Sequence, residues 1–178
     1  MIASRTTPLC LVVFLAATQS APAGEILVRE THLCCGSCIS AVEEALAGID
    51  GVSDVGADQN TKIIRFSAEN DEAATAAIES LAEAGFYGKA THGDEPLEFP
   101  DSGAKKDAKA ETVVFEGVHL CCGACVTGAK KALEDVAGVE TIEIDRTERR
   151  IKLIGADITV TKAVAALNAG GFYAKVAE

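Results

Sequence analysis

The spacing of apolar residues changes several times along this chain, and the same succession of spacings occurs twice. Short apolar runs typical of β-strands lie at 25–30 and 111–116. Each is followed by a stretch whose apolar residues recur every three or four positions, as in an amphipathic helix. These residues are Ile39, Val42, Leu46 and Ile49 in the first copy and Val126, Ala129, Leu133 and Val136 in the second. Gly51 and Gly138 predict the ends of these two helices.

The remaining pattern completes the same unit in both halves. Two strands are predicted at 52–58 and 62–67, and again at 139–145 and 149–154. The second helix is marked by Ala74, Ile78 and Leu81 in one copy and by Val160, Val164 and Leu167 in the other. A closing strand then opens with Phe-Tyr, whose rings we expect in the core or as caps. The order β-α-β-β-α-β, repeated, predicts an α+β fold of two tandem ferredoxin-like sandwiches.

The two halves are a duplication separated by a different kind of segment. Placing Cys34 on Cys121 aligns both copies over most of their length. Residues 92–110 hold the last two prolines, mix charges and lack apolar periodicity, which is typical of a flexible linker. The predicted domains are therefore 24–91 and 111–178, joined by this flexible linker.

Residues 1–23 have the features of a signal peptide. Arg5 precedes an apolar run at 9–17, and Ala21-Pro22-Ala23 forms a small-x-small cleavage site. The run is shorter than the about 20 residues that a spanning helix needs. We therefore expect a periplasmic or secreted protein with no membrane span in the mature chain; an uncleaved anchor is the alternative.

Composition narrows the choice of partners. The formal net charge is −11 and 48% of the residues are hydrophobic, which indicates a folded chain without the basic surface that nucleic acid requires. Cleavage after residue 23 would remove Cys10 and leave six cysteines. All six belong to one repeated motif.

The motif is THLCCGSC at 31–38 and VHLCCGAC at 118–125. In each copy it lies between a predicted strand and a predicted helix, so Cys38 and Cys125 fall in a first helical turn. A helix N-terminus carries partial positive charge and free N–H groups, which favour thiolate over thiol. The motif is therefore suited to a soft metal ion or to a redox couple.

The candidate metal ligands are His32, Cys34, Cys35, Cys38, His119, Cys121, Cys122 and Cys125. Three thiolates and one imidazole form a closed tetrahedral set for Zn(II) and would also hold Cd(II). This set predicts one ion per domain. Adjacent residues such as Cys34 and Cys35 tend to point apart in extended chain. If they diverge, Cys34 would reach a second ion, a partner protein or the other copy.

Strand, Cys-x-x-Cys, helix and then β-β-α-β ending in Gly-aromatic resembles the heavy-metal-associated domain family. The resemblance covers 25–91 and 111–178. The family includes copper chaperones, N-terminal modules of metal-exporting P-type ATPases and periplasmic mercury-binding proteins. It implies that Cys35 with Cys38, and Cys122 with Cys125, bind Cu(I) or Hg(II) as a dithiolate, without enzymatic turnover. It also implies a metal-handling partner, such as a metal-transporting ATPase, and an aromatic side chain near the metal loop.

This chain departs from the family pattern in two ways. Cys34 and Cys121 occupy the variable position before the first family cysteine, and His32 and His119 stand three residues before it. With these extra donors, the sequence predicts either Zn(II) or Cu(I) as the bound ion. It does not distinguish between the two.

Three other interpretations of the motif compete with metal transfer. Structural disulfides would leave one cysteine unpaired in each copy, because each holds three. A thiol–disulfide oxidoreductase would fit the Cys-x-x-Cys pairs, but thioredoxin-like folds place a cis-proline beside that motif and no proline follows Pro100. An interaction module with structural zinc is the third.

One difference between the copies concerns charge on the helix after the motif. Glu43-Glu44 in the first copy correspond to Lys130-Lys131 in the second. Opposite charges on two tethered domains would favour contact between these helices and bring both metal loops together. Two solvated helix faces are the simpler interpretation.

Overall fold

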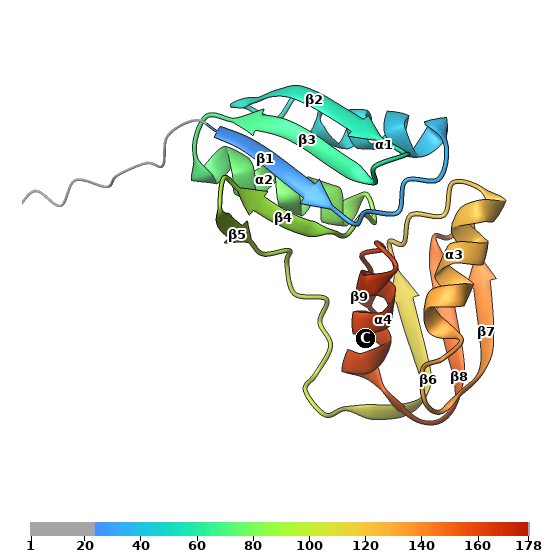
Figure 1. The fold of residues 1–178 in the computed structure, drawn as a ribbon. Coiled ribbons are helices and arrows are strands. Elements are labelled where there is room, and N and C mark those ends of the chain that lie inside the picture. The colour runs from blue at the N-terminus through green and yellow to red at the C-terminus, as the bar shows by residue number, and fades with distance from the viewer. Residues whose placement is uncertain (1–23, 178) are drawn as a thin grey trace, which may run out of the picture.

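The computed structural model describes residues 24–177 and shows two units side by side (Figure 1). The predicted signal peptide lies outside this range. The first unit consists of β1 (Gly24–Arg29), α1 (Gly36–Leu46), β2 (Val52–Asp58), β3 (Ile63–Ala68), α2 (Asp71–Glu83), β4 (Lys89–His92) and β5 (Glu95–Leu97). The second consists of β6 (Lys109–Glu116), α3 (Gly123–Leu133), β7 (Val139–Asp145), β8 (Arg150–Thr159), α4 (Val160–Ala169) and β9 (Lys175–Val176).

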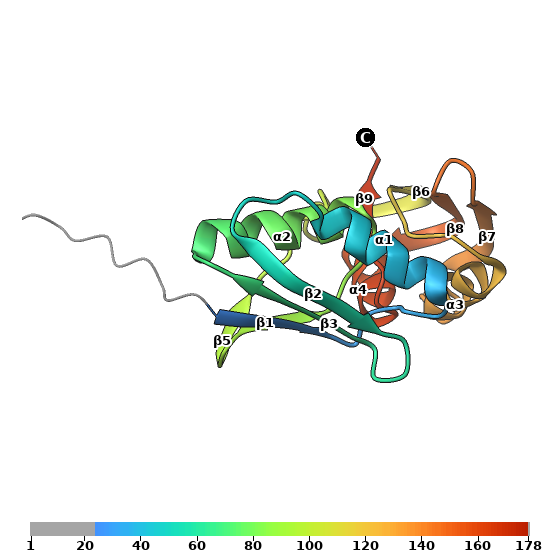
Figure 2. The same cartoon turned by 90° about the horizontal axis from the view of Figure 1, so that it is seen from above.

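Both units share the same order of four strands, and the first sheet has β5 as an additional edge strand. The strand order is β2-β3-β1-β4-β5 in the first sheet and β7-β8-β6-β9 in the second, and every pairing is antiparallel. The two helices of each unit pack against each other on one face of its sheet (Figures 1 and 2). The predicted α+β fold of two tandem ferredoxin-like units is therefore confirmed.

Each unit has an apolar core between its sheet and its helices. Alternate strand residues face the helices, as period-two patterning requires, so Val28 and Phe66 are fully buried or nearly so. They meet the buried Leu46 of α1 and Leu81 of α2 in the core. The second unit repeats this arrangement with Phe115, Leu133, Leu153 and Leu167. Among residues 24–177, the buried side chains are apolar apart from those of Thr31 and His119.

Both motif helices end earlier than their apolar pattern predicts. α1 ends at Leu46 and α3 at Leu133, not at the glycines that follow. Gly48, with φ of 75°, turns the chain first, and Ile49 packs against the core from the turn instead of from the helix. The prediction that Gly51 and Gly138 end the helices is therefore wrong. Gly138 instead lies beside β8, and its backbone oxygen accepts a hydrogen bond from the backbone N of Ala156 at 2.8 Å.

The segment predicted as a flexible linker contains regular structure. Strand β5 pairs with β4, and β6 begins at Lys109, inside the predicted range 92–110. The Phe99 ring lies 4.8 Å from that of Tyr87 and 6.4 Å from that of Tyr173. Tyr173 also donates a hydrogen bond to the backbone oxygen of Asp101 at 3.0 Å. A single apolar residue, Phe99, thus attaches this segment to both units, although the segment shows no periodic apolar pattern.

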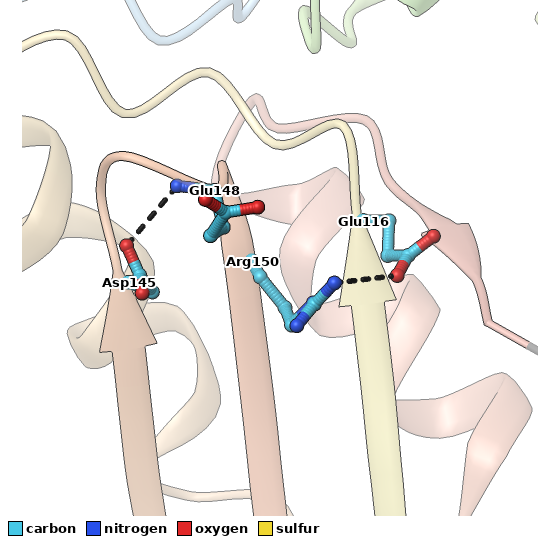
Figure 3. Close-up of polar contacts among 4 residues, drawn as sticks. All are labelled: Glu116, Asp145, Glu148 and Arg150. Carbon is cyan, nitrogen blue, oxygen red and sulfur yellow. Dashed lines mark hydrogen bonds and ion pairs between the residues drawn. The ribbon is translucent and has the colours of Figure 1, made fainter.

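The turn between β7 and β8 is closed by side chains (Figure 3). Asp145 Oδ1 accepts hydrogen bonds from the backbone N of Thr147 at 2.9 Å and of Glu148 at 3.0 Å, an Asx-type turn. Arg150 of β8 pairs with Glu116 of β6 at 3.2 Å. This turn contains two arginines that support the metal loop of the second unit.

The two second helices differ in how they begin, which leads to a prediction. Asn70 Oδ1 accepts a hydrogen bond from Ala73 N at 2.9 Å at the start of α2, whereas Thr159 makes no side-chain cap at the start of α4. We expect Asn70→Ala to lower the free energy of unfolding by about 1 kcal/mol, because an N-cap is lost. The matched control, Thr159→Ala, should change it by less than half as much. Urea unfolding measures both, and equal losses would contradict the expectation.

Candidate metal centre

The two units meet through the repeated Gly-Phe-Tyr segments at 85–87 and 171–173. These segments pair antiparallel, with Phe86 opposite Phe172 in an isolated bridge. Two hydrogen bonds close the bridge: the backbone N of residue 87 donates to the oxygen of residue 171 at 3.2 Å, and the N of residue 173 to the oxygen of residue 85 at 3.1 Å. The contact is reciprocal, so each repeat uses the same surface.

The glycines of this motif bring each unit close to the metal loop of the other. Gly85 and Gly171 have φ of 87° and 81°, a region that favours glycine. A Cβ on Gly85 would lie 2.3 Å from the backbone N of His119, and one on Gly171 would lie 2.3 Å from that of His32. The repeat of these glycines was visible in the sequence, but their interface role was not predicted.

The motif histidines pack across the interface. The His32 ring stacks on Phe172 at a centroid distance of 4.2 Å, and the His119 ring stacks on Phe86 at 4.2 Å. The Nε2 atoms of both histidines are buried without a hydrogen-bond partner in residues 24–177. Burial lowers the pKa of His32, so its imidazole stays neutral and can serve as a ligand.

The docking places all six motif cysteines in one cluster between α1 and α3. Nine Sγ···Sγ distances lie between 3.4 and 4.0 Å, and five of them join the two units. All six thiols are free. A disulfide requires about 2.05 Å between sulfurs, whereas thiolates on one ion lie farther apart. We call this set the six-cysteine cluster; its members are Cys34, Cys35, Cys38, Cys121, Cys122 and Cys125.

The helix starts position the sulfurs. Cys35 is the N-cap of α1 and Cys122 that of α3, and neither side chain caps a backbone N–H. Cys38 and Cys125 lie in the first helical turn, as predicted from the sequence. Both are buried. The four other cysteines are half-buried. Two sulfurs of the cluster are therefore fixed by the core, and four are within reach of solvent.

The helix N-terminus and burial divide the thiols into two kinds. The backbone N–H of Cys125, at the start of α3, is the largest cause that lowers the pKa of the Cys122 thiol to about 6. Burial raises the pKa of Cys34, and raises that of Cys121 to about 12. Of these three groups, Cys122 therefore ionises most readily, whereas the extra cysteine of each motif holds its proton more strongly.

Two arginine side chains hold the backbone of the second motif loop in place. Arg146 donates to the backbone oxygen of Cys121 at 2.8 Å. Arg149 donates to the oxygen of Gly117 at 2.7 Å and, across the interface, to that of Glu83 at 3.0 Å. Both arginines line a groove of about 510 Å³ that reaches the Cys121 side of the cluster.

The predicted charge complementarity is not what joins the units. Glu43, Glu44, Lys130 and Lys131 are all exposed. No ion pair links the two acidic residues to the two lysines in the described part of the chain. Contact between the domains does occur, but through buried glycine and aromatic residues, because a dry interface stabilises more than exposed ion pairs do.

The structure brings all eight predicted ligands to one place, but it groups them across the two loops. Three sets have ligand atoms within 4.8 Å of one another: Cys38, His119, Cys121 and Cys125; His32, Cys34 and Cys125; and Cys34, Cys35 and Cys122. Every set combines both units. The expectation of one complete ligand set within each loop is therefore not how the donors are arranged.

A fold of two ferredoxin-like units with clustered thiols at the helix starts defines a thiolate metal-binding module. Residues 32–86 match the family pattern described as "Heavy-metal-associated domain". The first unit of this chain is therefore a heavy-metal-associated domain, as its resemblance implied. The comparison with curated proteins gives no match.

Three solved structures illustrate the similarity. Oxidised MerP from Ralstonia metallidurans CH34 is 25% identical, with 40% of this chain and 100% of that chain covered and a TM-score of 0.36. The apo heavy-metal-associated domain of the copper chaperone for superoxide dismutase is 23% identical, with 46% and 86% covered and a TM-score of 0.35. The N-terminal soluble domains of Bacillus subtilis CopA are 18% identical, with 90% and 97% covered and a TM-score of 0.34. At these TM-scores, the likenesses add nothing to what the family match establishes.

Proposed function

We propose that this chain is an exported protein that binds a soft or borderline metal ion and hands it on by thiolate exchange. The observation that carries the proposal is the convergence of six free thiols from both motifs into one cluster. Cu(I), Zn(II), Cd(II) and Hg(II) all take thiolate ligands, and the added imidazoles favour Zn(II) beside Cu(I). The second unit, with its repeated motif, is proposed as another heavy-metal-associated domain.

Exchange with a partner requires access to the sulfurs, and the cluster offers it. Four of its cysteines are half-buried, and the arginine-lined groove opens toward Cys121. A metal-transporting ATPase or another metal-handling protein is the proposed recipient or donor. None of the helices in the described residues is long and apolar enough to cross a membrane. Export itself rests on the pattern of residues 1–23.

The geometry favours metal binding over the two rival functions. An oxidoreductase of thioredoxin type needs a cis-proline beside its Cys-x-x-Cys pair, and every peptide bond between residues 24 and 177 is trans. A structural zinc module needs its ion to fold, whereas each unit here has an apolar core built from its own sheet and helices.

Metal content tests the proposal directly. We expect mature protein, purified from its own exported compartment without added metal, to carry bound metal with its six thiols masked. The reason is that clustered thiolates bind such ions tightly and are protected by them. Elemental analysis and thiol counting before and after chelation measure this. Protein that arrives free of metal with two or three disulfides would instead support the redox function.

A further inference from the structure

We infer that the two motifs exchange ligands, so that each metal ion is held by His-x-Cys from one unit and Cys-x-x-Cys from the other. This inference rests on the proposed function and specifies its ligand sets. Site A comprises His32, Cys34, Cys122 and Cys125. Site B comprises His119, Cys121, Cys35 and Cys38. Each site would take one borderline divalent ion, such as Zn(II) or Cd(II), with three thiolates and one imidazole.

The sulfurs of site A form a closed triangle. Cys34 Sγ lies 3.4 Å from that of Cys122 and 3.4 Å from that of Cys125, and the latter two are 3.7 Å apart. The extra cysteine of the first motif thus approaches both sulfurs of the second unit's pair. His32 has a ring nitrogen within 4.8 Å of the Cys34 and Cys125 sulfurs.

Site B repeats this triangle with the units reversed. Cys121 Sγ lies 3.8 Å from that of Cys35 and 3.6 Å from that of Cys38, and the latter two are 3.8 Å apart. His119 has a ring nitrogen within 4.8 Å of the Cys38 and Cys121 sulfurs, and also of the Cys125 sulfur of site A. The pseudo-two-fold relation between the units therefore generates two equivalent sites.

Two further sets of three sulfurs, Cys38 with Cys121 and Cys125, and Cys34 with Cys35 and Cys122, lie within 4.8 Å of one another. The three remaining close contacts connect the triangles in single pairs: Cys34 with Cys38, Cys35 with Cys122, and Cys121 with Cys125. The Cys34 and Cys35 sulfurs belong to the second of these sets, in which Cys122 of the other unit is the third member.

The triangle edges suit tetrahedral coordination. A metal–sulfur bond of about 2.3 Å places two thiolates of a tetrahedral site about 3.8 Å apart. The observed edges of 3.4 to 3.8 Å need only small movements to reach this spacing. The histidine of each motif has a ring nitrogen within 4.8 Å of two of the three sulfurs of its proposed site. Each bound ion would therefore cross-link the two units.

Two triple variants test the exchange, each leaving three motif cysteines. Cys34→Ser with Cys122→Ser and Cys125→Ser removes site A and leaves site B whole. Cys34→Ser with Cys35→Ser and Cys38→Ser removes one whole loop, which leaves two sulfurs of site A and one of site B. Each variant replaces one buried and two half-buried cysteines, so the two are matched in burial.

Cd(II) titration, followed by thiolate-to-metal charge-transfer absorbance, gives the ion stoichiometry. We expect two ions for the unmodified protein, one for the variant that keeps site B, and no tight binding for the variant that loses one loop. Circular dichroism checks that both variants fold. In the background that keeps site B, His119→Ala should change the Co(II) ligand-field spectrum, and His32→Ala should not.

The alternative outcomes separate this inference from the proposed function. If the loop-deleted variant binds one ion and the other variant none, each loop binds alone and ligand exchange is wrong. If both variants bind one ion, the Cys-x-x-Cys pairs suffice and exchange is also wrong. Either result leaves metal binding intact. If the unmodified protein binds no Cd(II), Zn(II) or Cu(I), the proposed function itself fails.

Discussion

Gly171→Ala is expected to separate the two units and to disperse the six-cysteine cluster. A Cβ at this position would lie 2.3 Å from the backbone N of His32 and 2.8 Å from the backbone oxygen of Glu30. Both clashing atoms belong to the backbone of the first unit, which cannot rotate away as a flexible side chain can. The interface between the units therefore has to open. Scattering should show the change, because a compact chain of this length has a radius of gyration of about 16 Å and two separated units would approach about 20 Å.

Gly48→Ala is the matched control for this variant. Gly48 also has positive φ, 75° against 81° for Gly171, but a Cβ there meets nothing within 4 Å. Both substitutions therefore strain the backbone by about 1 kcal/mol, and only one creates a clash between units. Gly85→Ala, the repeat equivalent of Gly171→Ala, should reproduce its effect. Unchanged scattering for both interface variants would show that the Gly-Phe-Tyr contact does not hold the units together.

Metal loading is expected to produce the largest stabilisation of this protein. An ion that binds only the folded state at a free concentration 1,000-fold above its Kd adds about 4 kcal/mol, so two ions add about 8 kcal/mol. For a chain of this size, each kcal/mol raises the Tm by about 2–4 °C, which predicts a rise of roughly 15–30 °C. Calorimetry with and without Cd(II) measures the shift, and the metal-free protein should still unfold cooperatively.

The shape of the transition tests the link between the units. If each ion is bound by both units, the loaded protein should unfold in a single transition, since neither unit can release its ligands alone. Gly171→Ala should reduce the stabilisation strongly, whereas Gly48→Ala should keep it. Two separate transitions in the loaded protein, each raised independently, would indicate that each unit holds its own ion.

Much of the centre was predictable because its determinants are local in the chain. The repeat, the strand and helix order and the position of the cysteines at two helix starts follow from apolar spacing and from motif position. The eight candidate ligands were all identified from the motif. The match of residues 32–86 to the heavy-metal-associated domain agrees with this prediction.

Other features were misjudged where the deciding contact lies far away in sequence. The helix ends were placed at Gly51 and Gly138, although packing of the turn stops each helix earlier. The segment 92–110 lacks periodicity, yet Phe99 and the strand pairing of β5 order part of it. The charged helix faces suggested docking, but exposed charges contribute little, and the buried Gly-Phe-Tyr contact forms the interface.

The sequence by itself determined the repeated ferredoxin-like units, the kind of chemistry and which side chains could bind a metal. Only the tertiary structure decided which of those side chains lie together. Ligand grouping depends on how the two units dock, and that is set by two glycines and two aromatic rings that pack against the opposite loop. These residues act through steric contacts with a segment far away in the sequence, so no periodic pattern of apolar residues reveals them. Spacing within a motif cannot show that Cys34 faces the sulfurs of the other unit.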